Sequence, residues 1–192
     1  MRKPLPRIAA AVAMAAGLIL ATTGSADAAP AWSWQTGHIY RLESLSPDAG
    51  NTCMQDSREL TTYHGHPVDW VRNAPCDLYD TSYRWQVVIN ANGWANLENV
   101  GSGNCLDYSQ EYGLRGFPCY NTSYTGGWQE LRLVTRQAHG ITQVVLQNGR
   151  YQEDHANMCA DLSLQYGLRG YPCNGTSQDS GYQAWLVFDV AT

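Results

Sequence analysis

Cys105-Leu-Asp-Tyr-Ser-Gln-Glu-Tyr-Gly-Leu-Arg-Gly-Phe-Pro-Cys119 recurs further along the chain as Cys159-Ala-Asp-Leu-Ser-Leu-Gln-Tyr-Gly-Leu-Arg-Gly-Tyr-Pro-Cys173. Ten of the fifteen positions are identical, including both cysteines, the aspartate and the Tyr-Gly-Leu-Arg-Gly run. A weaker copy precedes them, opening with Cys53-Met-Gln-Asp and closing with Ala-Pro-Cys76. The first cysteines of the three copies are evenly spaced, and a fixed period of roughly 50 residues indicates one structural unit used three times.

The segment 1–28 has the features of a secretory signal peptide. Met1–Arg7 carries three positive charges, Ile8–Leu20 is an apolar run rich in alanine, and Ala26-Asp-Ala28 is a small-x-small cleavage signature. The apolar run is too short for a stable membrane span. We predict cleavage after Ala28, with Ala29 as the second choice, and a secreted, extracellular protein without a membrane span.

The predicted mature chain is acidic. Removing the segment 1–28 leaves nine basic and sixteen acidic residues, a net charge of −7, and all nine basic residues are arginine. Such a surface repels nucleic acid, and no basic stripe overrides that repulsion. Attraction to an anionic membrane surface is equally unfavourable. We therefore expect no nucleic-acid partner and no membrane partner.

All six cysteines lie in the mature part, two in each repeat. An even number in an exported protein favours three disulfides, for which the sequence alone allows fifteen connectivities. Equivalent units should close in the same way, so the repeat favours Cys53–Cys76, Cys105–Cys119 and Cys159–Cys173. No C-x-x-C spacing is present, and the His64-Gly-His66 and Glu153-Asp-His155 clusters lack further ligands at recognisable spacing. We expect neither a metal nor another cofactor.

The residue pattern predicts strands and no convincing amphipathic helix. Alternation of apolar with polar residues, or enrichment in aromatic and β-branched residues, predicts strands over 38–45, 83–89, 94–100, 128–134, 141–146 and 184–190. We therefore predict an all-β protein with about four short strands in each repeat. A leader at 29–37 would precede a single domain at 38–192, with repeats at about 38–91, 92–138 and 139–192.

Three consecutive all-β units, each with its cysteine pair and a tryptophan near the end, resemble the ricin B-chain-type β-trefoil lectins. The hallmark of that family is Gln-x-Trp in the last strand of each unit. It is intact in the third repeat as Gln183-Ala-Trp185, whereas the second reads Gly126-Gly-Trp128 and the first Tyr83-Arg-Trp85. The resemblance implies a β-trefoil with Trp85, Trp128 and Trp185 as core residues and with the glutamine lost twice.

In this family each repeat can hold one shallow sugar site. The resemblance assigns the sugar-binding aspartate, two residues after the first cysteine, to Asp107 and Asp161. It assigns the aromatic platform, two residues before the second cysteine, to Phe117 and Tyr171. A carboxylate accepts hydrogen bonds from neighbouring sugar hydroxyls, and a ring covers the apolar face of a pyranose.

The sequence departs from the family pattern at several of these positions. Where the family often has glutamine, four residues before the second cysteine, the chain has Arg115 and Arg169. The polar residue three before the tryptophan is matched by Thr125 and Tyr182. The first repeat has Gln55 for the aspartate and Ala74 for the aromatic residue, so we expect that repeat to be silent.

Each of these residues also has a structural interpretation. Asp107 and Asp161 would pair with the local arginines and hold two strands together, and Phe117 and Tyr171 would be buried core rings. The arginines themselves would either clamp an acidic sugar or serve the structure.

The preferred functional hypothesis is a secreted, non-enzymatic lectin that binds glycans or polysaccharide through repeats two and three. The alternative is a sugar-silent module that binds other secreted proteins, with Trp32 and Trp34 of the leader as anchors. Otherwise these two rings fold back over the open end of the barrel. No catalytic motif is present, although the sequence does not give the separation of its carboxylates, so a glycosidase pair stays an open alternative.

Overall fold

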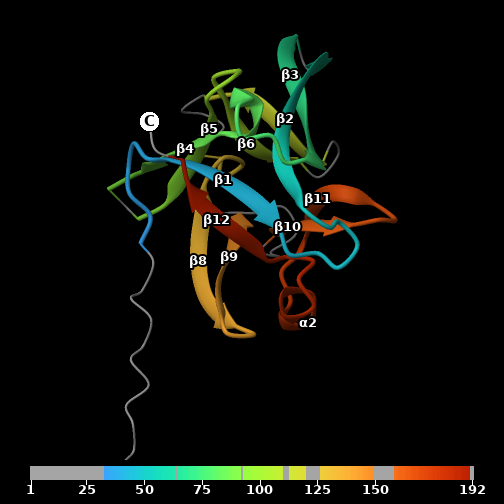
Figure 1. Ribbon diagram of the computed structural model, residues 1–192. Helices are drawn as coiled ribbons and strands as arrows, with labels where there is room; N and C mark the ends of the chain where they lie inside the picture. Colours follow the sequence, from blue (N-terminus) through green and yellow to red (C-terminus); the bar gives the residue numbers. More distant parts are fainter. Residues whose placement is uncertain are drawn as a thin grey trace, which may run out of the picture. The chain divides into compact units, whose positions relative to one another are not determined.

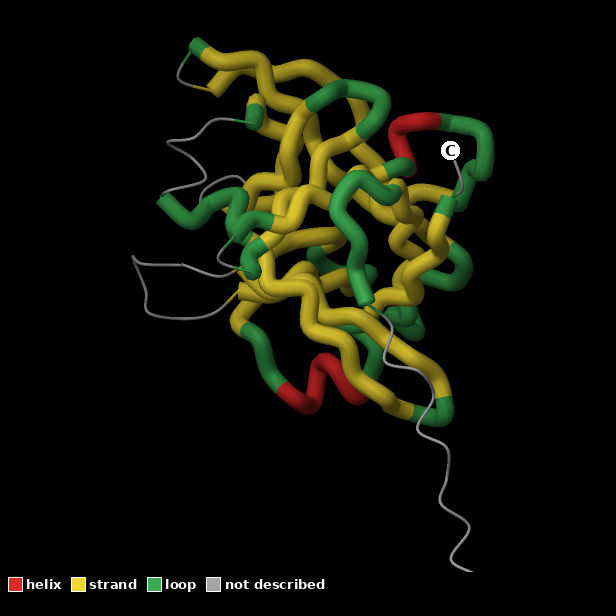
Figure 2. Tube along the Cα trace, turned by 90° about the vertical axis from the view of Figure 1, so that its left-hand side faces the viewer, coloured by secondary structure: helices red, strands yellow, loops and turns green. Residues whose placement is uncertain are grey.

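The computed structural model describes residues 33–63, 65–91, 93–109, 113–119, 126–148 and 158–190. Strands dominate this part of the chain, with two short helical segments (Figure 2). The elements are β1 (Ile39–Ser44), β2 (Thr52–Tyr63), β3 (His66–Pro75), η1 (Thr81–Tyr83), β4 (Trp85–Ile89), β5 (Ala95–Asn99), β6 (Asn104–Ser109), β7 (Gly113–Pro118), β8 (Leu131–Ala138), β9 (Ile141–Asn148), β10 (Met158–Ser163), β11 (Gly167–Pro172), α2 (Gly175–Asp179) and β12 (Trp185–Asp189).

Six of the described strands close into a ring (Figure 1). β1 pairs with β4 and β12, β5 pairs with β4 and β8, and β9 pairs with β8 and β12, all antiparallel. The ring therefore consists of three equivalent strand pairs, β1–β4, β5–β8 and β9–β12, in agreement with the threefold repeat of the sequence. Closure leaves the ring without a free sheet edge.

Three hairpins, β2–β3, β6–β7 and β10–β11, lie between the two ring strands of each repeat. β2–β3 is the longest, with a register shift between Asp56 and Leu60. β3 also pairs with β7, placing Trp70 opposite Arg115, and this contact adds a longer closed path of nine strands. The hairpins carry the candidate site residues, so their mutual packing decides which sites are open.

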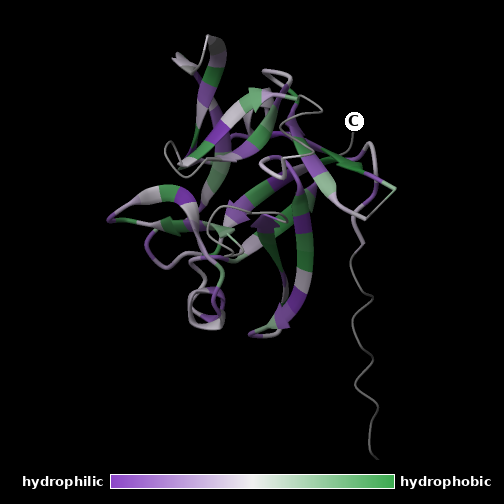
Figure 3. Cartoon of the chain, turned by 180° about the vertical axis from the view of Figure 1, so that it is seen from behind, coloured by the Kyte–Doolittle hydropathy of each residue, from purple (hydrophilic) through white to green (hydrophobic). Residues whose placement is uncertain are grey.

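The core lies between the ring strands. Hydrophobic and hydrophilic residues are interleaved along the strands (Figure 3), and every second residue of β1 is buried. Alternation of this kind sends one face of a strand to the core and the other to solvent. The largest fully buried side chains are Trp85, Trp185, Tyr40, Leu42, Met54, Leu97, Leu106, Leu114, Leu131, Leu146 and Leu162, with Gln129.

The ring shows that the core position of the second repeat belongs to Leu131, not to Trp128. Trp85 is paired with Tyr40 at the start of β4, Trp185 with Val144 at the start of β12, and Leu131 with Ala95 at the start of β8. Trp85, Leu131 and Trp185 are fully buried, whereas Trp128 is half-buried and precedes the strand. The assignment of Trp128 as a core residue was therefore wrong, and the strand expected from residue 128 begins at Leu131.

The second repeat also keeps the glutamine that the comparison of the repeats treated as lost. Gln129 lies two residues before Leu131 and is fully buried, like Gln183 before Trp185. Its Nε2 donates to the carbonyl oxygen of Pro118 at 3.0 Å, and Nε2 of Gln183 donates to that of Pro172 at the same distance. Both glutamines lie ten residues after the second cysteine of their repeat. The motif is Gln129-Glu-Leu131, and aligning on the tryptophan concealed it.

Three disulfides join Cys53 to Cys76, Cys105 to Cys119 and Cys159 to Cys173, the set that the repeat favoured. In each hairpin the first cysteine lies near the start of the first strand and the second cysteine directly follows the second strand. Each bridge therefore closes the open end of its hairpin. In the chain-entropy account, closing a loop of about 15 residues contributes about 3 kcal/mol.

The described part of the leader lies along β4. Trp34 packs edge-on against Tyr40, with 4.9 Å between the ring centroids. The backbone N–H of Gly37 donates to the carbonyl oxygen of Val87 at 2.8 Å, and that of Ile89 donates to Thr36 Oγ1 at 3.0 Å. For Trp34 these contacts favour the leader folding back on the domain. Trp32 lies outside the described residues.

A buried pair of aspartates connects the β2–β3 hairpin to the second repeat. Asp56 and Asp69 are 0% and 2% exposed. Ser102 Oγ donates to Asp56 Oδ2 at 2.6 Å, and Asn104 Nδ2 donates to Asp69 Oδ2 at 2.9 Å. Burial raises the pKa of Asp56, and the neighbouring Asp69 carboxyl adds to the rise.

The Asp56→Asn variant is expected to be more stable than the wild type at pH 7, and its advantage should fade as the pH falls. A raised pKa means that the folded state binds the proton more tightly than the unfolded state, so the wild type gains stability as Asp56 becomes protonated. The asparagine amide would donate a hydrogen bond at every pH, which the Asp56 carboxyl can do only when it is protonated. Urea denaturation of both proteins between about pH 4 and 8 measures the difference. Asp77→Asn, at an exposed residue, is the control; a stability difference that does not change with pH would contradict the prediction.

Candidate functional site

The third hairpin brings together the site residues expected in repeat three. Asp161 is paired with Arg169 across β10 and β11, and Cys159 with Tyr171. Arg169 Nε donates to Asp161 Oδ1 at 3.2 Å. The Arg169 guanidinium also lies over two exposed rings, 4.2 Å from the centroid of Tyr166 and 4.3 Å from that of Tyr171. Cation–π contacts of this kind hold the arginine and the rings in a fixed arrangement.

The tight turn between β10 and β11 follows from the local sequence. Gly167 has a φ of +66°, a conformation that costs glycine little, and Gly113 has the corresponding conformation at the start of β7. The N–H of Tyr166 donates to Ser163 Oγ at 3.3 Å. The turn places the Tyr166 ring on the same side as Arg169. Tyr-Gly-Leu-Arg-Gly is thus a hairpin motif, which explains its recurrence.

A pocket of about 310 Å³ opens beside this hairpin. Its polar groups come from three parts of the chain: the β1–β2 loop, the β10–β11 hairpin and the segment from α2 to β12. Tyr166 and Tyr171 are its exposed rings, 58% and 40% accessible. Its lining consists of Asp48, Asp161, Ser163, Gln165, Tyr166, Arg169, Tyr171, Ser177 and Tyr182.

The second hairpin has the equivalent residues, with phenylalanine in place of tyrosine, in a closed arrangement. Arg115 Nε donates to Asp107 Oδ1 at 2.8 Å, and the guanidinium carbon lies 4.9 Å from the centre of the Phe117 ring. Asp107 is 1% exposed and Phe117 7%. Burial raises the pKa of Asp107, an effect that Arg115 and a hydrogen bond from Gln129 oppose. The burial of Phe117 does not fit the role of a sugar platform, and in this repeat the structural interpretation fits the geometry.

Strand pairing explains the difference between the two hairpins. β7 is paired on one side with β6 and on the other with β3. Residues directly opposite each other in an antiparallel pair share a face of the sheet, so Trp70 of β3 lies beside Arg115. β11, in contrast, pairs only with β10 among the described strands. The Asp161 hairpin therefore has an edge with which no described strand pairs, whereas the corresponding edge of the Asp107 hairpin is paired with β3.

Trp128 occupies the position that Tyr182 has in repeat three. The N–H of Tyr108 donates to the carbonyl oxygen of Trp128 at 2.9 Å, and that of Leu162 donates to the carbonyl oxygen of Tyr182 at 2.8 Å. Tyr182 lines the pocket of the third repeat, so Trp128 holds the equivalent position of the second repeat and not the core position. Thr125, which the sequence alignment placed there, lies outside the described residues.

The first hairpin contains an arginine that the sequence reasoning missed. Arg72 is opposite Gln55, and its Nε donates to Gln55 Oε1 at 3.2 Å. Its Nη1 donates to Glu59 Oε1 at 2.7 Å. Arg72 lies four residues before Cys76, the same spacing that defines Arg115 and Arg169. An arginine therefore ties the two strands of all three hairpins, whether or not a pocket is present.

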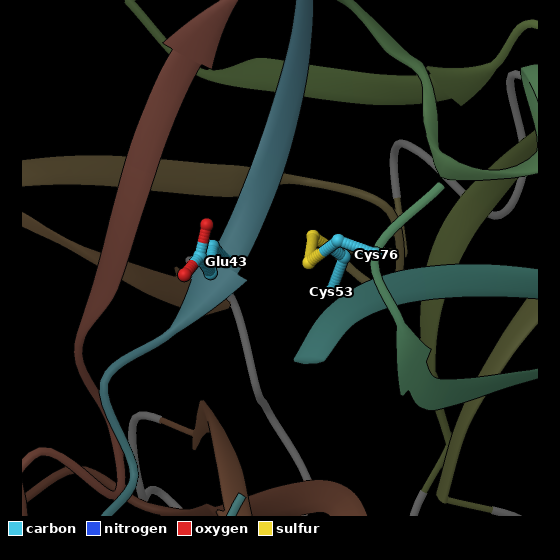
Figure 4. Close-up of side chains that lie close together, drawn as sticks. All are labelled: Glu43, Cys53 and Cys76. Atoms are coloured by element: carbon cyan, nitrogen blue, oxygen red, sulfur yellow. A yellow bond between two sulfur atoms is a disulfide. The ribbon is translucent and has the colours of Figure 1, made fainter. Parts of the chain in front are cut away.

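Glu43, Cys53 and Cys76 come close enough to suggest a metal centre (Figure 4). The two sulfur atoms form a disulfide, so neither is a thiolate that could bind an ion. The His64 and Glu153-Asp-His155 positions lie outside the described residues.

Within the part of the chain that the structure describes, no helix is long and apolar enough to cross a membrane.

No family model matches the sequence, and no curated protein matches it. Solved structures do match. PSL1a in complex with E64 has a TM-score of 0.59 at 14% identity, and the Polyporus squamosus lectin, bound to the epitope Neu5Aca2-6Galb1-4GlcNAc, has 0.54 at 14%. In both cases the match covers 82% of this chain and about half of the other. The designed threefold-symmetric protein ThreeFoil has a TM-score of 0.56 at 18% identity, over 79% of this chain and 98% of its own.

These structures agree with the pairing of the strands. The neighbours are β-trefoil proteins, and the six-stranded ring with three hairpins gives this chain the same architecture. Identities of 14 to 18% establish similarity of fold alone. The chain has a β-trefoil fold.

Proposed function

We propose that the protein is a secreted, non-enzymatic carbohydrate-binding protein whose sugar site is the pocket of the third repeat. The observation that carries the proposal is the open pocket in which Asp161 lies beside the exposed Tyr171 ring. Asp161 and Tyr171, which the lectin resemblance assigned in this repeat, both line it, as does Arg169, which stands where the family often has glutamine. The lectin among the structural neighbours supports the same class of ligand.

The chemistry of the pocket suits a pyranose. Arg169 lies over one face of Tyr171, and the ring, which is 40% exposed, would offer its other face to the apolar C–H side of the sugar at low entropic cost. Asp161 uses Oδ1 for Arg169, and its other oxygen accepts no hydrogen bond from a described residue. Asp161 is only 3% exposed and reaches the pocket as part of its lining, so a sugar hydroxyl would approach that oxygen from the pocket side, while Arg169 holds the carboxylate in place. Asp107, Arg115 and Phe117 belong to the framework of the second repeat in this proposal. Arg115 and Phe117 are each 7% exposed and leave no face for a sugar, whereas the Arg169 side chain is 27% exposed and Tyr171 is 40% exposed.

The Tyr171→Ala variant tests the proposal. A glycan array on the mature protein selects the ligand, and calorimetry then compares affinities. Loss of the ring contact, worth about 0.5 to 1.5 kcal/mol, should weaken binding about 2- to 12-fold while the melting temperature stays unchanged. Tyr79→Ala is the matched control because Tyr79 is 88% exposed and lies outside the pocket.

Equal binding by the Tyr171 variant and the wild type would place the sugar elsewhere. An array without any ligand would contradict the lectin function and favour the protein-interaction alternative. Release of sugar fragments from a bound oligosaccharide would contradict the non-enzymatic part of the proposal.

A further inference from the structure

The pocket of the third repeat contains a carboxylate from the first repeat. Asp48 belongs to the loop between β1 and β2, and its Oδ2 accepts a hydrogen bond from the N–H of Leu164 at 3.3 Å, across 116 residues of sequence. The loop is held in this place by its backbone, because the N–H of Leu45 donates to the carbonyl oxygen of Ala184 at 3.0 Å. Asp48 is therefore a fixed part of the pocket wall.

We propose that Asp48 makes this pocket selective for protonated amino sugars over their N-acetylated and acidic counterparts. The proposal rests on the sugar-binding function and goes further by naming the class of sugar. It also assigns a specificity role to a residue that lies outside the repeat whose site it completes.

The charges of the lining support this selectivity. Of the lining residues, Asp48 and Asp161 carry negative charge and Arg169 positive charge, while the other six are neutral. Arg169 is already paired with Asp161, so the negative charge of Asp48 is not compensated. Of the two carboxylate oxygens of Asp48, Oδ2 accepts from Leu164, and Oδ1 accepts no hydrogen bond within the described residues. Oδ1 can therefore accept from a ligand.

The three ligand classes differ in what they offer this acceptor. An ammonium group donates a charge-assisted hydrogen bond, which is about twice as strong as a neutral one. An acetamide or hydroxyl donates a neutral hydrogen bond, and a uronic acid or sialic acid brings a second negative charge next to the first. The pocket should therefore rank amine above neutral sugar and neutral sugar above acid.

This ranking also separates the two arginine hypotheses. A free arginine clamp would favour an acidic sugar. Here the positive charge of the guanidinium is already paired through Nε with Asp161, and its planar group lies over the rings of Tyr166 and Tyr171. The acidic surface of the predicted mature chain adds long-range repulsion of acidic glycans.

The test compares matched ligands on the mature protein at about pH 6. Glucosamine and galactosamine oligomers are each titrated as the free amine and as the N-acetyl form, with an oligogalacturonide as the acidic probe. The wild type should bind at least one amine about tenfold more tightly than its N-acetyl form, and the oligogalacturonide more weakly than either. Asp48→Asn keeps an oxygen for the Leu164 N–H and should abolish the preference. Asp77→Asn makes the same change of charge at an exposed aspartate outside the pocket, where Oδ1 accepts from the N–H of Tyr79 at 2.8 Å, and should keep the preference.

The outcomes separate this inference from the proposed function. If glycans bind and Tyr171→Ala weakens them, but Asp48→Asn leaves the amine preference unchanged or no preference exists, the role of Asp48 is wrong and the sugar site stands. If the wild type bound the oligogalacturonide more tightly than the amines, the role of Asp48 would also be wrong. If none of these ligands and no glycan on the array binds, both the inference and the proposed function fail.

Discussion

Replacing Trp185 with alanine is expected to lower the free energy of unfolding by about 3 to 5 kcal/mol. Trp185 is fully buried in the ring, and its Nε1 donates to the carbonyl oxygen of Ala160 at 3.3 Å. Removing the indole leaves a cavity that the strands of the closed ring cannot move in to fill. It also leaves the carbonyl oxygen of Ala160 without its donor. Urea denaturation measures the loss, with circular dichroism as the check that the variant folds.

Trp128→Ala is the comparison that gives this prediction its meaning. Trp128 is half-buried and lies before β8, so its loss should cost no more than about 2 kcal/mol. Leu131→Ala, at the true counterpart of Trp185, should cost about 2 to 5 kcal/mol. If Trp128→Ala destabilised the protein as much as Trp185→Ala, the assignment of Leu131 to the core position of the second repeat would be incorrect.

The sequence was sufficient for the features that each repeat forms by itself. The cysteine spacing predicted the three disulfides, and the Asp-to-Arg spacing within the hairpins allowed the pairing of Asp107 with Arg115 and of Asp161 with Arg169. These contacts are local, and their spacing is repeated. Arg72 lies four residues before Cys76, as Arg115 and Arg169 do before Cys119 and Cys173. This spacing identifies it, although the first repeat has neither the aspartate nor the aromatic residue of the other two.

The errors arose where one side chain type replaced another at an equivalent position. Trp128 was aligned with the family's core tryptophan because it is the tryptophan near the end of the second repeat. In that repeat, however, Leu131 occupies the core position, opposite the small Ala95. A tryptophan three residues earlier then resembles the motif without occupying its position. The distance of ten residues from the second cysteine to Gln129 and Gln183 was the stronger signal.

The difference between the second and third sites depends on contacts between repeats, which a repeat alignment does not contain. β3 pairs with β7 because the first hairpin is long enough to reach it, and this pairing puts Trp70 beside Arg115. Asp48 reaches the third pocket from the opposite end of the sequence. Ten identities in fifteen positions therefore do not give two equal sites, since neighbouring repeats supply the surroundings.

Replacing Asp107 with alanine is expected to cost about 3 to 5 kcal/mol of stability, because it removes the ion-pair partner of a buried guanidinium. The side chains of Asp107 and Arg115 are 1% and 8% exposed, and Arg115 Nε lies 2.8 Å from Asp107 Oδ1. So little of the arginine side chain is exposed that solvent cannot replace the carboxylate as its partner. Thermal and urea denaturation of the variant measure the loss.

Asp161→Ala is the matched variant in the third repeat, and it should cost clearly less. The side chain of Arg169 is 27% exposed and keeps its contacts with Tyr166 and Tyr171, so solvent can stabilise its charge after the pair is broken. The double variant Asp107→Leu/Arg115→Met, which replaces the buried pair by apolar groups, should regain most of the stability lost in Asp107→Ala. Equal losses for Asp107→Ala and Asp161→Ala would mean that the two carboxylates have the same role, and the distinction between a closed framework pair and an open sugar site would not hold.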